Sequence, residues 1–174
     1  MKKLKKIALI ILAIVGIAAI GIFIFIQTLK PTYDGEQELI GLEKEVQVYY
    51  DTYGIPHIYG QNEKDAFRAL GYVHAQDRLW QMELLRRIAP GRLSEVFGSD
   101  MITTDKFMLS LGIDDASGKT ISNLDLNSEV IVLTQAYLDG VNSFIEEGPT
   151  PVEYYLTGLD KKPFVLKDVY NTIG

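Results

Sequence analysis

The sequence predicts an α+β fold, a mainly helical domain preceded by one transmembrane helix. Residues 7–26 form an unbroken block of apolar and glycine residues, long enough for a helix that crosses a bilayer. Residues 45–59 are rich in β-branched and aromatic side chains on both sides of a glycine turn, which is typical of a β-hairpin. Two longer segments, residues 62–89 and 127–147, carry apolar residues at helical spacing.

The apolar block reads IALIILAIVGIAAIGIFIFI and has no polar face. At a rise of about 1.5 Å per residue it spans about 30 Å, the hydrocarbon thickness of a membrane. A cleaved signal peptide is the alternative interpretation, but its apolar region is typically about 7–15 residues long and ends in a small-x-small cleavage site. The block here is longer and continues into QTL without such a site, which favours an uncleaved anchor over residues 7–26.

Charge predicts the orientation of this anchor. Lysines are concentrated in residues 1–6, before the apolar block, and only Lys30 follows the block closely. The positive-inside rule then makes residues 1–6 a basic cytoplasmic N-terminus. We therefore expect a membrane-anchored protein whose domain is extracytoplasmic, in the periplasm or on the outer cell surface.

The exported part is acidic. Residues 1–30 contain five lysines and no acid, so the remaining residues hold 12 basic and 23 acidic side chains, a net charge of −11. This charge argues against a nucleic-acid partner and against binding to anionic lipid. The sequence has no cysteine, which excludes a disulfide framework, a thiolate nucleophile and a cysteine-based metal site in these residues.

A linker and a domain follow the anchor. Residues 27–43 mix proline, glycine and polar residues, and predict a juxtamembrane linker. Residues 44–174 form the domain. Its hairpin at residues 45–59 turns at the segment DTYG, and Pro56 restricts the second strand to an edge position or a strand start.

Helices are expected over most of the domain. Asn62 is a candidate N-cap for the helix that ends at Pro90-Gly91, and Gly71 weakens the middle of this helix. The remaining expectations are short helices at 92–97 and 104–111, a polar loop at 114–127, a helix at 127–147 capped by Asn127, and short segments at 152–157 and 167–173. The residues expected on one face of helix 127–147 are Val130, Leu133, Tyr137, Val141 and Phe144. The last segment is cut after about one helical turn, which predicts truncation.

The two histidines, His57 and His74, do not lie in a zinc-type spacing. We interpret His74 as a structural side chain, hydrogen-bonded within packed helices. A group of charges begins three residues further along the same helix. Asp77, Arg78 and Glu83 lie at offsets that allow ion pairs with the arginines that follow. Such pairs contribute about 0.3–0.5 kcal/mol each when exposed, and when buried they specify packing more than they stabilise. Carboxylate recognition by the arginines is the alternative interpretation.

Motifs of complete active sites are missing from the sequence. No serine lies in a G-x-S-x-G or S-x-x-K pattern, and neither type of glycine-rich phosphate-binding loop occurs. The residues by themselves predict an anchored, acidic, mainly helical domain. We assign no catalytic, cofactor-binding or metal-ligating residue.

Several segments of the domain carry recognisable motifs. Residues 50–60 read YDTYGIPHIYG, residues 69–83 read ALGYVHAQDRLWQME, and residues 86–98 read RRIAPGRLSEVFG. In this order they resemble the D-x-x-G-[IMV]-P-H-I-x-A, GYVxAQDRLxQME and RRxxxGxLxEVxG motifs of the penicillin acylase (penicillin amidase) family. Three further segments fall where the family has similar residues: DKF, AYLDGVNSFI, and KPF followed by Asp168. The resemblance covers about residues 44–174.

The resemblance implies an N-terminal-nucleophile hydrolase with a four-layer αββα sandwich, of which residues 44–174 are the incomplete, mainly helical α-chain portion. It implies a precursor that cuts itself into an α and a β chain. The new N-terminal Ser, Thr or Cys of the β chain attacks a linear amide bond of a small N-acyl substrate, a β-lactam side chain or an acyl-homoserine lactone, with its own amine as the base. The expected partners are thus the β chain, the substrate, and the membrane through residues 7–26.

The chain departs from the complete family pattern. Nothing in it matches the nucleophile or the oxyanion-hole donors, and the family's acyl-pocket helix and its calcium-ligand glutamate are expected after Gly174. We expect no cofactor in this chain, although a structural calcium is possible in the full enzyme. The Asp77/Arg78 and Arg86/Arg87 cluster is expected to organise the helices against the β-chain sheet, which would bury it. The alternative function is a truncated or degenerate anchored remnant, at most a binding module.

Overall fold

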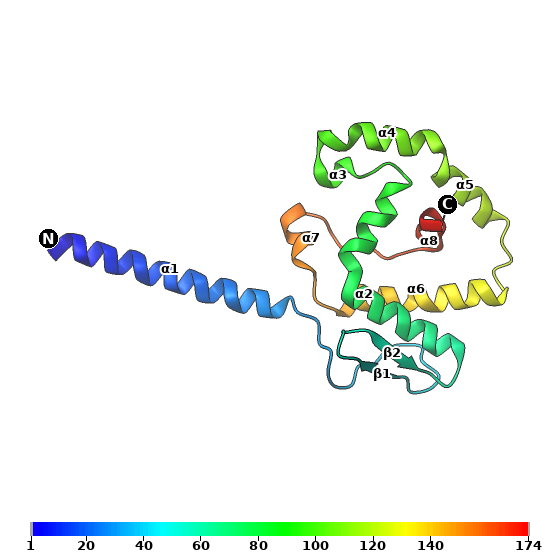
Figure 1. The fold of residues 1–174 in the computed structure, drawn as a ribbon, viewed down its shortest axis with the longest axis horizontal. Coiled ribbons are helices and arrows are strands. Elements are labelled where there is room, and N and C mark those ends of the chain that lie inside the picture. The colour runs from blue at the N-terminus through cyan, green and yellow to red at the C-terminus, as the bar shows by residue number, and fades with distance from the viewer. Residues whose placement is uncertain (1, 174) are drawn as a thin grey trace.

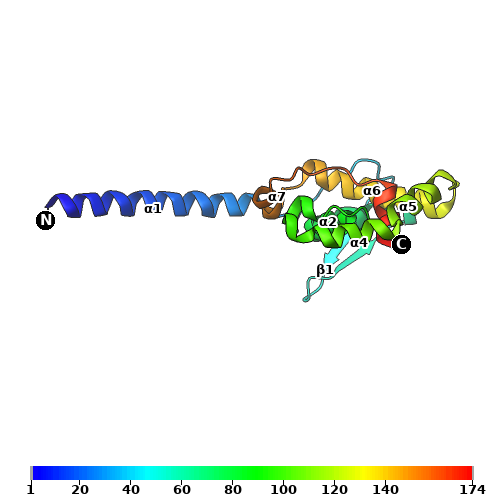
Figure 2. The same ribbon diagram turned by 90° about the horizontal axis from the view of Figure 1, so that it is seen from above.

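The computed structural model describes residues 2–173. Its elements, in chain order, are α1 (Lys2–Thr28), β1 (Gln47–Tyr50), β2 (Pro56–Tyr59), α2 (Glu63–Ile88), α3 (Ser94–Phe97), the 3-10 turn η1 (Ser99–Met101), α4 (Ile102–Leu111), α5 (Ile113–Ser122), α6 (Glu129–Glu147), α7 (Val152–Thr157) and α8 (Leu166–Ile173). Helix α1 projects as a rod from one end of a body built from the other elements (Figures 1 and 2). The described chain is thus mainly helical with one small sheet.

The described side chains of helix α1 are exposed on all sides. Over Lys5–Thr28 it is long and apolar enough to cross a membrane, a criterion that a signal sequence near the N-terminus can also meet. Its large apolar side chains, among them Ile17 and Phe23, are exposed. Because an aqueous solvent would have to hydrate this whole surface, the helix requires an apolar environment or removal.

The predicted hairpin is confirmed. Strands β1 and β2 pair antiparallel, with Val48 opposite Ile58 and Tyr49 opposite His57. The chain reverses through Gly54, whose φ of +76° is open to glycine and costly for most other residues. Half-buried Val48 and Ile58 share one face of this ribbon, which lies beside α2 (Figure 1).

The core lies where α2 crosses α6 (Figure 1). Asn62 caps α2 as predicted, because its side chain accepts a 2.7 Å hydrogen bond from the Asp65 amide. The buried apolar cluster comprises Ala75, Leu79, Met82, Leu138, Val141, Phe144, Ile145, Tyr154 and Phe164. Helices α2 and α6 therefore supply most of the core, and α7 and the segment before α8 close it.

Glycine at the crossing has a structural reason. A Cβ at Gly71 would lie 1.9 Å from the Tyr137 carbonyl oxygen, and one at Gly140 would lie 1.9 Å from the Arg68 carbonyl oxygen. The two backbones touch at both points. Gly71, expected to weaken its helix, is the residue that permits the crossing.

Three local expectations differ from the structure. The polar loop predicted at 114–127 is helical from Ile113 to Ser122, because Asp114 receives hydrogen bonds from Lys167 (2.8 Å) and Asn171 (2.9 Å) of α8. Ser128, in place of Asn127, occupies the N-cap position of α6. The face expected for α6 is also shifted, since Val130 is exposed while Ala136 and Leu138 are buried.

Candidate functional site

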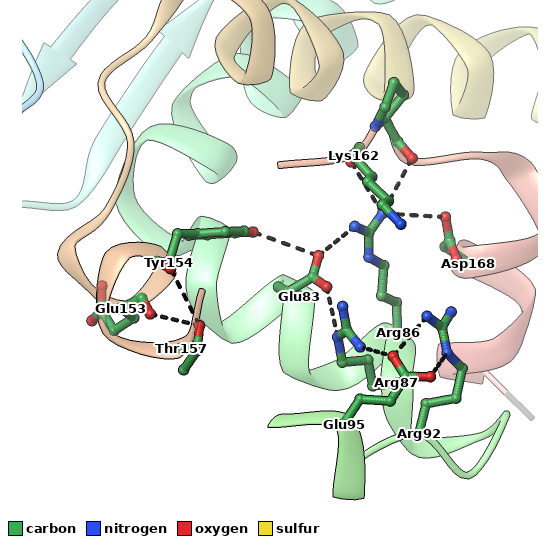
Figure 3. Close-up of polar contacts among 11 residues, drawn as sticks. Glu83, Arg86, Arg87, Arg92, Glu95, Glu153, Tyr154, Thr157, Lys162 and Asp168 are labelled. Carbon is green, nitrogen blue, oxygen red and sulfur yellow. Dashed lines mark hydrogen bonds and ion pairs between the residues drawn. The ribbon is translucent and has the colours of Figure 1, made fainter. Parts of the chain in front are cut away.

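The most concentrated polar structure of the domain surrounds Glu83 (Figure 3). Glu83, Arg86 and Arg87 lie at helical offsets on one face of α2, and the Glu83 side chain is fully buried. One Glu83 oxygen accepts a 2.7 Å bond from Arg87 Nε. The other pairs with the Arg86 guanidinium and accepts a 3.5 Å bond from the Tyr154 hydroxyl. We call this set, together with Arg92 and Glu95, the Glu83 network.

Arg86, which is largely buried, and the buried Arg87 connect α2 to distant segments. Arg86 Nη1 donates to the carbonyl oxygens of Lys162 and Pro163, both at 3.1 Å, and its guanidinium stacks 4.2 Å from the Phe164 ring centroid. Arg87 pairs with Glu95 at the start of α3. The network therefore fixes α2 to the segment before α8 and, through Arg87, to α3.

A bidentate ion pair holds the outer edge of this network. Arg92 Nε and Nη2 donate to the two oxygens of Glu95 at 2.8 and 2.9 Å. Hydrogen bonding from Arg92, reinforced by Arg87, holds the pKa of the Glu95 carboxyl below its usual range. Burial instead raises the pKa of Asp168, which lies 3.9 Å from Arg86.

This geometry corrects two expectations. The Arg86/Arg87 pair is already largely covered by the chain's own segments, without a β-chain sheet. It also does not form one cluster with Asp77 and Arg78, which lie about two turns earlier on α2. The arginines of the network already bind Glu83, Glu95 and backbone carbonyls, so this geometry does not support carboxylate recognition.

The Asp77/Arg78 segment marks a kink in α2. Arg78 departs from helical geometry, with φ −135° and ψ 17°. Next to the kink, Asp77 accepts a 2.9 Å bond from the Tyr33 hydroxyl, and Gln76 donates a 2.6 Å bond to the Thr32 carbonyl. Residues expected to form a free linker are therefore bound to the side of α2.

The rest of the linker is bound through two buried charges. The Asp65 carboxylate accepts hydrogen bonds from the Glu43 amide at 3.0 Å and from the Lys44 amide at 2.9 Å. Arg68 donates to the Gly41 carbonyl and forms a 2.8 Å ion pair with Asp139 on α6. Sequence reasoning missed both groups, because their partners lie between 21 and 71 residues away.

The bound linker, β1 and α2 line an open cleft of about 560 Å³. Its lining includes Tyr33, Tyr49, Tyr50, Tyr72 and Gln76. The Tyr50 hydroxyl donates to Gln76 Oε1 at 3.2 Å, and burial raises the pKa of Tyr50 to about 12. The cleft offers aromatic surface and hydrogen-bonding groups.

The histidines have local roles. His57 Nε2 lies 3.4 Å from Asp51, a carboxylate that also accepts the Tyr53 and Ile55 amides in the hairpin turn. His74 Nδ1 lies 2.7 Å from the Tyr137 hydroxyl, in agreement with its structural interpretation. Desolvation and the nearby Arg78 charge lower the pKa of His74. Within residues 2–173 no group of three His, Asp or Glu side chains is placed to hold a metal ion.

The fold and these contacts define a mainly helical α+β module in which buried charges position helices. Residues 45–174 match the family model described as penicillin amidase. The chain therefore belongs to the penicillin amidase family.

Curated relatives agree with this assignment. The chain is 41% identical over 140 residues to a penicillin acylase 2 proenzyme of Pseudomonas sp. (strain SE83), a match that covers 80% of this chain and 18% of the relative. It is 38% identical over 112 residues to penicillin G acylase of Escherichia coli, covering 64% of this chain and 13% of that one. An acyl-homoserine lactone acylase QuiP of Pseudomonas fluorescens (strain Pf0-1) is 37% identical over 118 residues, covering 68% and 14%. The chain spans less than a fifth of the length of these relatives.

A solved structure has the same fold over most of the chain. A thermostable penicillin G acylase from Alcaligenes faecalis superposes with a TM-score of 0.63 at 26% sequence identity. The superposition covers 74% of this chain and 69% of that one. The mainly helical arrangement is therefore that of penicillin G acylase in this region.

Proposed function

We propose that this chain is the N-terminal part of an amidase precursor that hydrolyses the linear amide bond of N-acyl substrates. The observation that carries the proposal is the collinear match of residues 45–174 to the penicillin amidase family. The relatives are named as penicillin acylases and acyl-homoserine lactone acylases, and an amide between an acyl group and an amine is the chemistry common to both. We propose the same bond type for this protein, with a β-lactam side chain or an acyl-homoserine lactone as substrate.

In this proposal the described residues are a scaffold. The Glu83 network and the α2–α6 crossing set the positions of the helices, which form one outer layer of an αββα sandwich. The β chain supplies the nucleophile, an N-terminal Ser, Thr or Cys whose free amine accepts the proton as its side chain attacks the amide carbonyl. The amine product leaves, and water then releases the acid from the acyl-enzyme.

We further propose that residues 7–26 remain as an uncleaved anchor, with residues 1–6 in the cytoplasm and the domain outside. The length of the apolar block and the lysines before it support this topology. The enzyme would then act on substrates outside the cytoplasm while tethered to the membrane.

Expression of the complete gene tests the proposal. The expected product is a membrane-bound precursor that separates into two chains and releases acid from penicillin G or from an N-acyl-homoserine lactone. Replacement of the new N-terminal Ser, Thr or Cys by Ala should abolish hydrolysis without loss of the folded precursor. A complete product that stays in one piece and hydrolyses neither substrate would favour the anchored remnant.

A further inference from the structure

Helix α7 presents an apolar face outward. Val152, Tyr155 and Leu156 lie at i, i+3 and i+4 on this six-residue helix and are 42%, 56% and 80% exposed. Its opposite side holds Tyr154, which is 2% exposed and reaches Glu83. The helix is thus fixed to the core from inside, and its outer apolar side chains remain exposed in the described part of the chain.

The position of α7 relates this face to the anchor. Tyr155 packs edge-on against Phe25 of α1, with ring centroids 5.3 Å apart and an interplanar angle of 74°. Both views show α7 beside the end of α1 that joins the domain (Figures 1 and 2). Phe25 is the next-to-last residue of the apolar block, so α7 lies at the level where that block ends.

That level is the boundary of the hydrocarbon layer if α1 spans the membrane. Tyrosine is enriched at this boundary because its ring enters the apolar region while its hydroxyl stays hydrated. Leu156 and Val152 lie on the same side of α7 as Tyr155 and would enter the lipid with it. The exposed Lys30 lies two residues after the end of α1, at the height of the headgroups.

We propose that the outer face of α7, formed by Val152, Tyr155 and Leu156, inserts into the membrane interface beside α1. This second attachment limits rotation of the domain about the anchor and fixes which side of the domain faces the membrane. The inference rests on the proposed anchoring by residues 7–26. Because the part of the chain after residue 30 has a net charge of −11, insertion is driven by apolar contact and needs no anionic lipid.

Single cysteines in the complete precursor test the inference. Residues 1–174 contain no native cysteine, so L156C, V130C and I17C can each be labelled with an environment-sensitive fluorophore, and the parent protein gives the background. Val130 is the matched control, because it is 71% exposed at the end of α6 remote from α1 (Figure 1). The precursors are placed in phosphatidylcholine vesicles, and quenching by lipid-borne nitroxide is compared with quenching by iodide in the water.

The expected result is that the L156C label is quenched by shallow nitroxides and protected from iodide, while the V130C label shows the reverse. The I17C label reports the anchor separately and should respond to deep nitroxides. Lipid contact at I17C with iodide access at L156C overturns the inference and leaves the anchor intact. Protection of L156C from both quenchers also overturns it, because the rest of the precursor then covers α7. Iodide access at I17C contradicts the anchoring itself.

Discussion

Gly71 of α2 lies directly against the carbonyl oxygen of Tyr137 on α6. A Cβ at this position would sit 1.9 Å from that oxygen, and the reciprocal contact at Gly140 is equally close. Backbone atoms cannot move aside as a flexible side chain can, so the two helices would have to separate to accept a methyl group.

Replacing Gly71 or Gly140 by Ala should therefore destabilise the protein, by about 1–3 kcal/mol or more, through overpacking. The measurement is thermal unfolding of the complete precursor. Gly118→Ala is the matched control, since the nearest atom to a Cβ there is 3.9 Å away and α5 should gain up to about 1 kcal/mol of helix propensity. Equal unfolding temperatures for all three variants would show that the helices do not cross in this way.

The Glu83 network makes a second prediction. Glu83→Gln leaves Arg86 and Arg87 buried without the carboxylate between them, which should cost about 3–5 kcal/mol. Glu95→Gln is the comparison, because Glu95 is about half exposed and its loss should cost only about 1 kcal/mol. Denaturant unfolding of the two variants measures the difference, and a cost for Glu95→Gln equal to that for Glu83→Gln would contradict the assignment of Glu83 as the centre.

Acid sensitivity follows from Asp65 and Asp105. Burial opposes their ionisation, but hydrogen bonds outweigh it and hold both pKa values below the usual range. The donors to Asp65 include the Glu43 amide, the Asn62 side chain and the Lys44 amide, and Asp105 accepts the Ser94 and Leu93 amides.

Because the folded-state pKa of each is depressed, the stability they contribute is fully present above the unfolded pKa of about 3.9. It should be lost as the pH falls from there through the lower folded pKa. The unfolding temperature measured from pH 7 down to pH 3 should drop steeply below about pH 4. Asp65→Asn and Asp105→Asn should each flatten that drop, whereas Asp160→Asn, at an exposed position, should leave it unchanged.

Residues 31–174 expressed alone should be poorly soluble or molten. Phe67, Leu70, Leu85, Phe107 and Leu109 are exposed on the body of the domain, and large exposed apolar side chains promote association. Near-ultraviolet circular dichroism and a thermal scan check this prediction. A sharp, cooperative transition with a native-like aromatic signal would show that this segment is stable without the rest of the precursor.

Local signals explain what the sequence predicted correctly. The Asp51–Gly54 turn, the Asn62 cap and the break at Pro90-Gly91 each act within a few residues, so the hairpin and the ends of α2 were accessible from pattern alone. The ion pairs of Glu83 were also predictable, because offsets of three and four place them on one helix face.

Long-range contacts explain the errors. Helix α5 depends on Asp114 binding Lys167 and Asn171, which are 53 and 57 residues away. The burial of Arg86 depends on Phe164 and on carbonyls 76 and 77 residues further along the chain. The periodicity of a single sequence does not reveal such long-range pairings. The Arg86/Arg87 cluster was therefore expected to need the β chain to bury it.

The most direct test of the central claim is the coding sequence beyond the codon for Gly174. An amidase precursor predicts an open frame of several hundred codons that contains a Gly-Ser, Gly-Thr or Gly-Cys junction, the start of a β chain with an N-terminal nucleophile. A stop codon directly after Gly174 would contradict the claim, because this chain could not then hydrolyse amides by that route.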